Sequence, residues 1–469
     1  MTVSLFHRFY ATEYMVPAGL RQSPFPSDRQ IYRQDFAMAW PSTVESVLIS
    51  LVSAVDTMMV GGLGSAAISA VGICAQPRLL TLAVIISLNV GVTAVVARRK
   101  GENNEAGAIR CLKQALAISV ILTFLVCGLA FTFAEPLLIL AGAEGEYLGL
   151  SLQYLRIIII GLLFYAVTLT INAAQRGAGN TKVALRTNLA ANLINLVFNY
   201  LLINGHGGFP RLEVAGAAIA TALGNLVAFA MALASILNPK CFINLRNPIS
   251  WRFEKNVVAS ITKVSSSALA EQFFLRFGML TFTRLVSGLG TVPYATHVVC
   301  MNIMNLSFSL GDGLGTAASA LVGQSLGARR PDLAMIYGKV TQRMAFTAAL
   351  IMAGTFLLGR FAIIRLFIDE EPVIALGGRV MIIIALICLI QTTQVVLAGS
   401  LRGAGDTAFV ALLALLGLTI VRPVAAYLLC YPAGLGLIGA WFGLLADQLL
   451  RMVLLTWRFQ GDSWTKIKL

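Results

Sequence analysis

Charged side chains are scarce in this sequence. Only 12% of the 469 residues are Asp, Glu, Lys or Arg, whereas 58% are hydrophobic and the mean hydropathy is +0.81. A soluble globular domain carries roughly 25% charged residues, so an ordinary soluble protein is excluded. Period-two alternation of polar and apolar residues is also missing, and a membrane β-barrel is therefore not predicted.

The sequence also lacks the motifs of common catalytic and metal sites. It contains no GxxxxGKS/T, HExxH or CxxC motif, its three histidines are dispersed, and its seven cysteines are scattered. We therefore expect a protein that is not an enzyme and uses no organic cofactor. A net charge of +14 favours nucleic-acid binding in a soluble protein, but here the basic residues alternate between loops, so no nucleic-acid partner is expected.

Long apolar runs fill most of the chain. Each is long enough to cross a hydrocarbon core of about 30 Å as a helix. The sequence therefore predicts an all-α integral membrane protein with twelve transmembrane helices. The expected cores are 40–62, 75–97, 112–134, 153–175, 183–203, 214–236, 264–286, 297–322, 340–360, 377–400, 408–430 and 436–456.

Lys and Arg gather in the even-numbered loops between these spans. Examples are Arg98, Arg99 and Lys100 in the second loop, and Arg329 and Arg330 in the eighth. Because cytoplasmic loops carry the excess of positive charge, both termini are predicted to be cytoplasmic in a multi-pass protein.

The spans suggest a division into five parts. Residues 1–36 read as a loosely ordered cytoplasmic extension without an apparent signal peptide. Residues 37–237 and 264–457 form an N-lobe and a C-lobe of six spans each. A cytoplasmic linker, 238–263, joins the lobes, and 458–469 form a cytoplasmic tail.

The two halves repeat each other at an offset of 226 residues. RGAGNT at 176–181 matches RGAGDT at 402–407, the glycine run at 60–64 matches 286–290, and Glu45 matches Glu271. Six spans is an even number, so both repeats enter the membrane in the same sense. Parallel repeats of this kind are typical of transporters, with a substrate path between the halves, although a channel or a flippase is compatible with them.

Asp56 is the leading functional candidate. A carboxylate within an apolar span costs several kcal/mol, so such residues are functional candidates by default. Glu45, eleven residues earlier, lies on nearly the same helix face. Because Glu45 and Glu271 occur in both halves, they fit either helix packing or a gate common to both bundles.

A polar set occurs in the first half only. Asp56, Asn195 and Asn199 correspond to Phe282, Val421 and Ala425 in the second half, and Thr221 corresponds to Leu444 at the offset of 223 that holds later in the chain. A carboxylate among amide and hydroxyl oxygens suits a proton or a hard monovalent cation such as Na⁺. Asn and Thr also join helices within membranes without further function. Pro41 either kinks the first span or simply stands at the start of its helix.

These motifs together resemble the multidrug and toxic compound extrusion (MATE) transporters over about residues 37–457. The motifs are VDTMMVGGLG, RGAGNT, RGAGDT, NLVFNYLLI and GAAIAT. The resemblance implies two bundles around a V-shaped cavity that exports cationic or amphipathic drugs against a proton or sodium gradient. It assigns coupling to Asp56, Asn195 and Asn199 and a conformational role to Pro41.

The second half departs from one branch of that family. Where NorM-type members carry an aspartate, this chain has Gln391, and Leu275 stands where they carry a glutamate. The resemblance therefore favours a DinF-like mode with coupling in the first half, and it leaves Glu271 as a secondary candidate.

Three other functions compete with drug export. A flippase for lipid-linked precursors would bind pyrophosphate through arginines such as Arg276, Arg284 and Arg422. A membrane prenyl or acyl transferase would need paired Asp-rich motifs or a His–Asp pair, which the sequence lacks, and a channel is the third alternative. We expect a cation-coupled antiporter of the bacterial cytoplasmic membrane, working as a monomer on small drug-like molecules among membrane lipids.

Overall fold

The computed structural model describes residues 10–17, 21–22, 26–61, 63, 65–141, 143, 146–239, 241–248, 251–467 and 469. Several predictions fall outside these residues: Gly62 and Gly64 of the repeated run, 1–9, 18–20 and 23–25 of the extension, 240 and 249–250 of the linker, and 468 of the tail.

Long helices make up almost all of the described chain. They are α2 (Asp28–Gly61), α3 (Ser65–Gly101), α4 (Glu105–Thr132), α6 (Glu146–Gly177), α7 (Thr181–Asn204), α8 (Glu213–Leu237), α9 (Lys255–Ser287), α10 (Thr291–Gly327), α11 (Pro331–Leu358), α13 (Glu371–Ala404), α14 (Thr407–Ala414), α15 (Arg422–Cys430) and α16 (Gly436–Gln460). Shorter elements are η1 (Thr12–Met15), α5 (Ala134–Leu140), η3 (His206–Gly208), α12 (Arg360–Arg365) and η5 (Ser463–Lys466). The all-α prediction is confirmed.

Each predicted span overlaps one of these long helices, except that the eleventh is divided. There α14 continues through a π-helical segment, η4 (Leu415–Val421), into α15. Nine stretches of the described residues are long and apolar enough to cross a membrane. Helices α7, α9 and α10 are not among them. Four asparagines on one face of α7 and a glutamate with two arginines on α9 lower the hydropathy of those two helices.

The chain forms two compact units. Unit 1 contains Met1–Ser46 and Ala270–Leu469, and unit 2 contains Val47–Leu269. Helices α2 and α9 therefore each contribute residues to both units. The divisions fall next to Glu45 and Glu271, which are equivalent positions of the two repeats.

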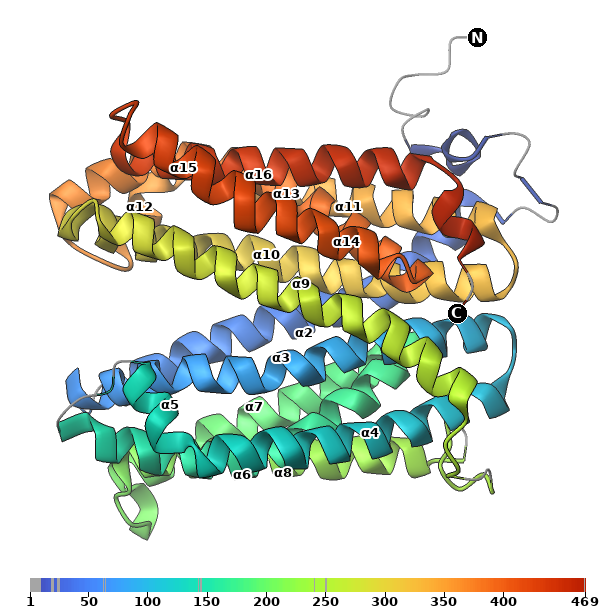
Figure 1. Cartoon of the computed structure of the whole chain (residues 1–469), viewed down its shortest axis with the longest axis horizontal. Helices are drawn as coiled ribbons and strands as arrows, with labels where there is room; N and C mark the ends of the chain where they lie inside the picture. The colour runs from blue at the N-terminus through green and yellow to red at the C-terminus, as the bar shows by residue number, and fades with distance from the viewer. Residues whose placement is uncertain are drawn as a thin grey trace. The chain divides into compact units, whose positions relative to one another are not determined.

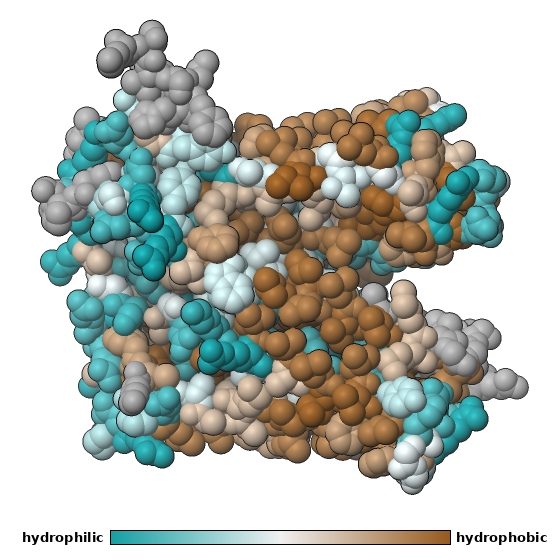
Figure 2. All heavy atoms as spheres, turned by 180° about the vertical axis from the view of Figure 1, so that it is seen from behind, coloured by the Kyte–Doolittle hydropathy of each residue, from teal (hydrophilic) through white to brown (hydrophobic). Residues whose placement is uncertain are grey.

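Within each unit the helices lie lengthwise beside one another (Figure 1). In unit 2, α6 packs on α3 and α8, and α7 packs on α8. In unit 1, α13 packs on α10 and α11, and α15 packs on α16. On the face in Figure 2, hydrophobic side chains cover the middle of the helices and hydrophilic ones gather near their ends. This distribution fits helices that cross a hydrocarbon layer.

Two glycines of the repeated RGAG motifs allow the same close helix contact in both units. A Cβ atom on Gly177 would lie 2.7 Å from the carbonyl oxygen of Thr93, and one on Gly403 would lie 2.0 Å from that of Ser319. Thr93 and Ser319 are themselves 226 residues apart. The later glycines of the motifs have φ angles of 90° and 92°, which L side chains rarely adopt. The repeat is therefore a repeat of backbone packing as well as of sequence.

Several described residues of the N-terminal extension are packed into unit 1 rather than loosely ordered. Met15 and Val16 are buried in the hydrophobic core of unit 1. The Lys339 Nζ donates to the Met15 carbonyl at 2.6 Å, and Thr341 donates to Asp35 at 2.8 Å. Apolar burial and these bonds attach the segment to α11, which hydropathy of the segment alone does not reveal.

The predicted linker also carries regular structure, because α9 begins at Lys255, inside it. Its earlier part folds back on unit 2, where Lys113 Nζ donates to the Asn247 carbonyl at 3.0 Å and Ile243 is fully buried. In the tail, the buried Trp464 indole donates to the Phe459 carbonyl at 3.0 Å.

Candidate functional site

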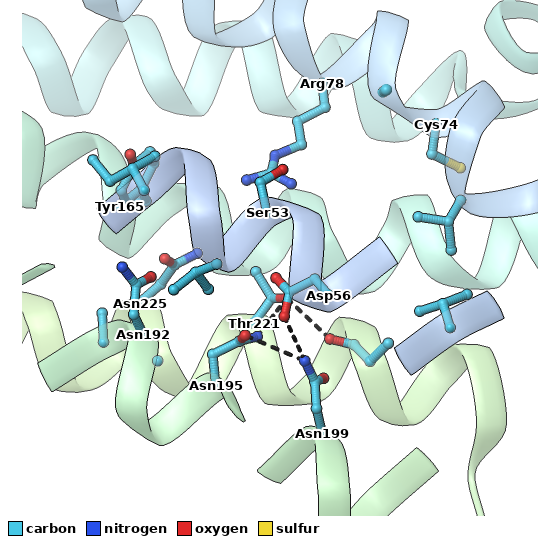
Figure 3. A pocket seen from close by; sticks show the side chains of 18 of the residues that line it. Ser53, Asp56, Cys74, Arg78, Tyr165, Asn192, Asn195, Asn199, Thr221 and Asn225 are labelled. Atoms are coloured by element: carbon cyan, nitrogen blue, oxygen red, sulfur yellow. Dashed lines mark hydrogen bonds between the residues drawn. The ribbon is translucent and has the colours of Figure 1, made fainter. Parts of the chain in front are cut away.

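A cavity of about 480 Å³ lies inside unit 2. Residues of α2, α3, α6, α7 and α8 line it. Its volume falls in the range typical of small-molecule sites, roughly 300–1,000 Å³. The predicted polar set, Asp56, Asn195, Asn199 and Thr221, lines this one cavity (Figure 3).

The sequence of α7 explains how amides reach the cavity. Asn188, Asn192, Asn195 and Asn199 recur at spacings of four, three and four residues, which places them on one helix face. That face meets α8 closely because Gly224 has no Cβ, and such an atom would lie 2.6 Å from the Ala191 carbonyl oxygen.

Hydrogen bonds join the polar set into one network. The Asn199 amide nitrogen donates to Asp56 Oδ1 at 2.7 Å and to Asn195 Oδ1 at 3.2 Å. Asn195 in turn donates to the Thr221 hydroxyl at 3.1 Å. Rotating the Asn195 amide brings its nitrogen to Asp56 Oδ1 at 2.7 Å and its oxygen to the Thr221 hydroxyl at 3.1 Å. Asp56 is thus hydrogen-bonded to α7 in either orientation.

One acceptor of this network is left unused. Asn199 is 1% exposed, and its Oδ1 has no hydrogen-bond donor among the described residues. Its amide nitrogen lies next to the Asp56 carboxylate. A buried acceptor without a donor is costly, so a ligand that brings a donor or a positive charge to Asn199 Oδ1 would improve the site.

The cavity contains a charged residue that the sequence analysis did not select. Arg78, on α3, lines it together with Asp56, and its side chain extends toward Ser53 of α2 (Figure 3). A signal for it was available, since Arg78 is an ionisable residue within the predicted span 75–97. Tyr154 and Tyr165 of α6 also line the cavity and were not predicted.

Pro41 and Glu45 do not line this cavity. Pro41 lies inside α2, thirteen residues after its first residue Asp28, so the interpretation as a helix-start proline is wrong. Without an amide hydrogen, Pro41 removes one bond of the helical ladder. Its conformational role stays a prediction. Glu45 is buried, at 2% exposure.

The secondary candidates Glu271 and Gln391 lie in unit 1. Glu271, on α9, accepts hydrogen bonds from Nε at 3.2 Å and from Nη2 of Arg402, the arginine of the second RGAG motif. Gln391, on α13, is 3% exposed. The ion pair with Arg402 neutralises the charge of Glu271.

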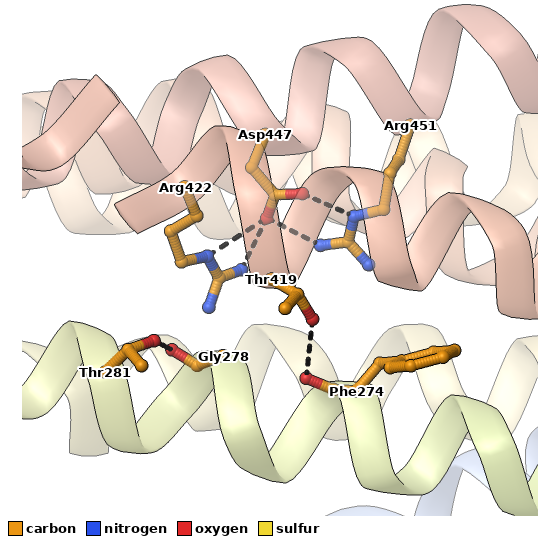
Figure 4. Close-up of polar contacts among 7 residues, drawn as sticks. All are labelled: Phe274, Gly278, Thr281, Thr419, Arg422, Asp447 and Arg451. Atoms are coloured by element: carbon orange, nitrogen blue, oxygen red, sulfur yellow. Dashed lines mark hydrogen bonds and ion pairs between the residues drawn. The ribbon is translucent and has the colours of Figure 1, made fainter. Parts of the chain in front are cut away.

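The structure also gives partners to Arg422 and Asp447 of unit 1. Asp447, fully buried on α16, accepts from Arg422 Nε at 3.1 Å and Nη2 at 2.6 Å (Figure 4). It also accepts from Arg451 Nε at 2.8 Å and Nη2 at 3.0 Å. Arg422, one of the arginines considered for pyrophosphate, is thus engaged by an internal carboxylate.

Comparison with protein families gives two matches along the chain. The family model described as MatE matches residues 41–201 and 268–428. The two matches begin 227 residues apart, close to the offset of 226 found within the sequence. The comparison therefore supports the two repeats as two copies of the same family unit.

Curated relatives match over nearly their whole length. A probable multidrug resistance protein NorM of Thermotoga maritima is 26% identical, covering 93% of this chain and 94% of the relative. The uncharacterized transporter YisQ of Bacillus subtilis is 23% identical, covering 92% and 94%.

Solved structures share the fold at low sequence identity. An outward-facing multidrug resistance MATE family transporter of the MOP superfamily superposes with a TM-score of 0.87 at 19% identity, covering 93% of this chain and 97% of its own. A MOP superfamily transporter from Pyrococcus furiosus gives 0.86 at 20% identity, with coverage of 93% and 97%.

Proposed function

Because the chain belongs to the MatE family, we propose that it exports small cationic or amphipathic molecules in exchange for a proton or a sodium ion. The names of its relatives support export of drug-like molecules. The family and the fold are those of a transporter rather than an enzyme. The proposed setting is the bacterial cytoplasmic membrane, with both termini cytoplasmic and a functional monomer whose lobes, 37–237 and 264–457, alternate the access.

One observation carries the assignment of coupling to Asp56. The amide nitrogen of the buried Asn199 donates to its carboxylate, while Asn199 Oδ1 lacks a hydrogen-bond donor among the described residues. If the Asn199 amide turns over, a proton on Asp56 supplies a donor to its oxygen, and a sodium ion supplies a positive charge that carboxylate, amide and hydroxyl oxygens coordinate well. Asn195 and Thr221 complete this oxygen-rich group.

The proposed cycle uses competition for Asp56. In the outward-facing state a proton or sodium ion binds the carboxylate and displaces the positively charged substrate. Neutralising the carboxylate removes the cost of exposing a charge to the protein interior, and α2 can repack, helped by the missing bond at Pro41. The ion shifts the equilibrium only as far as its affinities for the two states differ. It leaves to the cytoplasm, and the next substrate takes its place.

We propose further that coupling is confined to the first half, in the DinF-like mode. Gln391 provides no carboxylate, and Glu271 is ion-paired with Arg402. A flippase is less well supported, because Asp447 engages Arg422 and would oppose a pyrophosphate there.

Purified protein in liposomes tests the proposal. Ethidium transport is measured with a proton gradient and with a sodium gradient, each imposed alone. Transport under one gradient identifies antiport and its ion, and Asp56→Asn should abolish it. As a matched control, Asp369→Asn removes a carboxylate from an exposed position outside the cavity and should transport normally. Full transport by Asp56→Asn would reject the assignment, and no transport under either gradient would reject cation-coupled export.

A further inference from the structure

We propose that Arg78 makes the cavity of unit 2 selective for zwitterionic substrates, with Asp56 holding their ammonium group and Arg78 their carboxylate. The inference rests on the proposed function of this cavity and narrows it to a class of substrate.

The charge of the cavity is divided between two poles. Asp56 on α2 and Arg78 on α3 are the two charged side chains among the described residues that line it. The distance between their charged atoms exceeds the 4.0 Å limit of an ion pair, since no such pair joins them in the described chain. Two opposite charges that do not neutralise each other can each bind a ligand group.

Arg78 differs from three arginines of unit 1 that lie within long helices. Arg402, Arg422 and Arg451 each hold a carboxylate through an ion pair. Within the described residues, Arg78 makes no hydrogen bond or ion pair, although it lies in the apolar stretch Ser69–Gly101 of α3 and is half-buried. A guanidinium without a hydrogen bond or ion pair in such a stretch is costly and points to a functional role.

The geometry of a guanidinium favours a carboxylate as its ligand. Its planar fork of N–H donors matches the two oxygens of a carboxylate in a bidentate arrangement. A substrate with a single positive charge would gain from Asp56 but be repelled by Arg78. A substrate with an ammonium and a carboxylate satisfies both poles.

The remaining walls limit the substrate to an amphipathic molecule of drug size. Tyr154 and Tyr165 offer aromatic surface, while Leu79 and Leu82 offer aliphatic surface. A volume of about 480 Å³ accommodates a ring system between the two charged groups. The expected substrate is therefore an amphipathic zwitterion.

This assignment changes the charge moved in each cycle. Exchange of one proton or sodium ion for a monocation moves no net charge. Exchange of one such ion for a zwitterion moves one positive charge inward, so the membrane potential would help to drive export. Wild-type transport of a zwitterion should accelerate when the interior is made negative.

Norfloxacin and its ethyl ester provide a matched pair of probes, since the ester keeps the amine and lacks the carboxylate. Binding is measured by the fluorescence of each probe with purified protein in detergent, and transport is measured in liposomes. The wild type should bind norfloxacin about tenfold more tightly than the ester, the scale of one charge-assisted bond.

Arg78→Gln should remove this preference, because binding of norfloxacin weakens while the ester and ethidium, no longer repelled, bind more tightly. Arg78→Lys should restore part of it. Arg156→Gln is the matched control, because Arg156 is an exposed α6 arginine outside the cavity, and it should change neither probe.

Equal weakening of both probes by Arg78→Gln would show a structural role for Arg78 and overturn the proposal. Equal affinity of the wild type for norfloxacin and its ester would overturn it too, as would failure to bind norfloxacin at all. The proposed function is tested separately by gradient-driven transport of ethidium, which has no carboxylate. Binding measured in detergent tests the selectivity of the cavity even if no transport is found.

Discussion

The cavity of unit 2 and the ion-pair cluster of unit 1, formed by Arg422, Asp447 and Arg451, are built on corresponding helices of the two repeats. Their polar groups differ in how completely they are hydrogen-bonded. In the cavity, Asp56 meets amides, and Asn199 Oδ1 is left without a donor among the described residues. In unit 1, Asp447 accepts four hydrogen bonds from two arginines. Phe282, the counterpart of Asp56, lies under the Arg422 guanidinium, 5.7 Å from its carbon.

The cavity around Asp56 can therefore exchange a bound ion or substrate, whereas the hydrogen-bonding groups around Asp447 are already satisfied. A group whose bonding is complete gains nothing from an ion, whereas an incomplete oxygen cluster does. The repeated fold therefore supplies similar scaffolds, and the polar residues decide which of them exchanges ligands.

Asp447→Asn should have the largest effect on stability. It removes the carboxylate between Arg422 and Arg451, which are almost fully buried, and leaves two neighbouring positive charges. Loss of one partner of a buried pair costs about 3–5 kcal/mol. Thermal unfolding in detergent should show the loss, while the folded fraction keeps coupled transport. A stable variant without coupling would place the ion site in unit 1. The control Asp462→Asn removes an exposed carboxylate and should leave the unfolding temperature unchanged.

Asn199→Ala introduces the residue that stands at the equivalent position 425 of the second half. It removes a donor to the charged carboxylate, worth about 1.5–3 kcal/mol, so binding of a proton should become about tenfold tighter or more, whereas binding of sodium, which loses an amide oxygen, should weaken. The ion concentration that half-saturates transport measures this change. An unchanged half-saturating ion concentration would show that Asn199 does not contribute to the ion site. The control is Asn225→Ala, which changes an amide on the α8 wall of the cavity.

Gly403→Ala and Gly177→Ala test whether the repeats share their packing. Each new Cβ would meet a backbone carbonyl oxygen closer than 3.0 Å, so both variants should lose about 1–3 kcal/mol of stability. Gly128→Ala is the matched control, because its Cβ would meet nothing within 4 Å, and it should be as stable as the wild type or more so. The unfolding temperatures of the three variants are compared with that of the wild type. If only one of the first two is destabilised, the packing is not shared.

Glu271→Gln should have the smallest effect. The ion pair joins the buried Glu271 to the partly exposed Arg402, and Gln keeps one acceptor for it, so the loss of stability should be smaller than that of Asp447→Asn and coupled transport should persist. Liposome transport with the driving ion is the measurement. Loss of coupling in a variant of normal stability would move the ion site to the second half.

Much of this arrangement could be predicted from the sequence. Apolar runs predicted the helices because their length is set by the membrane, and a constant offset from Glu45 to Thr181 revealed the repeat because no net insertion disturbs that stretch. Comparing the halves selected Asp56, Asn195, Asn199 and Thr221, which line one cavity. The coupling role of these residues stays a prediction.

Other features depend on contacts that a linear pattern does not contain. The partners of Asp447 depend on how α15 and α16 are rotated about their axes. The packing of Met15 depends on Lys339, 324 residues away. Arg78 was overlooked because the comparison of halves favoured acids and amides, although a lone arginine in an apolar span was itself a signal.

Ion release on substrate binding tests the central claim most directly. Ethidium is added to purified protein in detergent, and released protons are followed with a pH dye in weak buffer, or displaced sodium with a radioactive tracer. The account predicts release from the wild type and from Glu271→Gln, and none from Asp56→Asn that still binds ethidium. Continued release from Asp56→Asn, or its loss in Glu271→Gln, would contradict a coupling site in the first half.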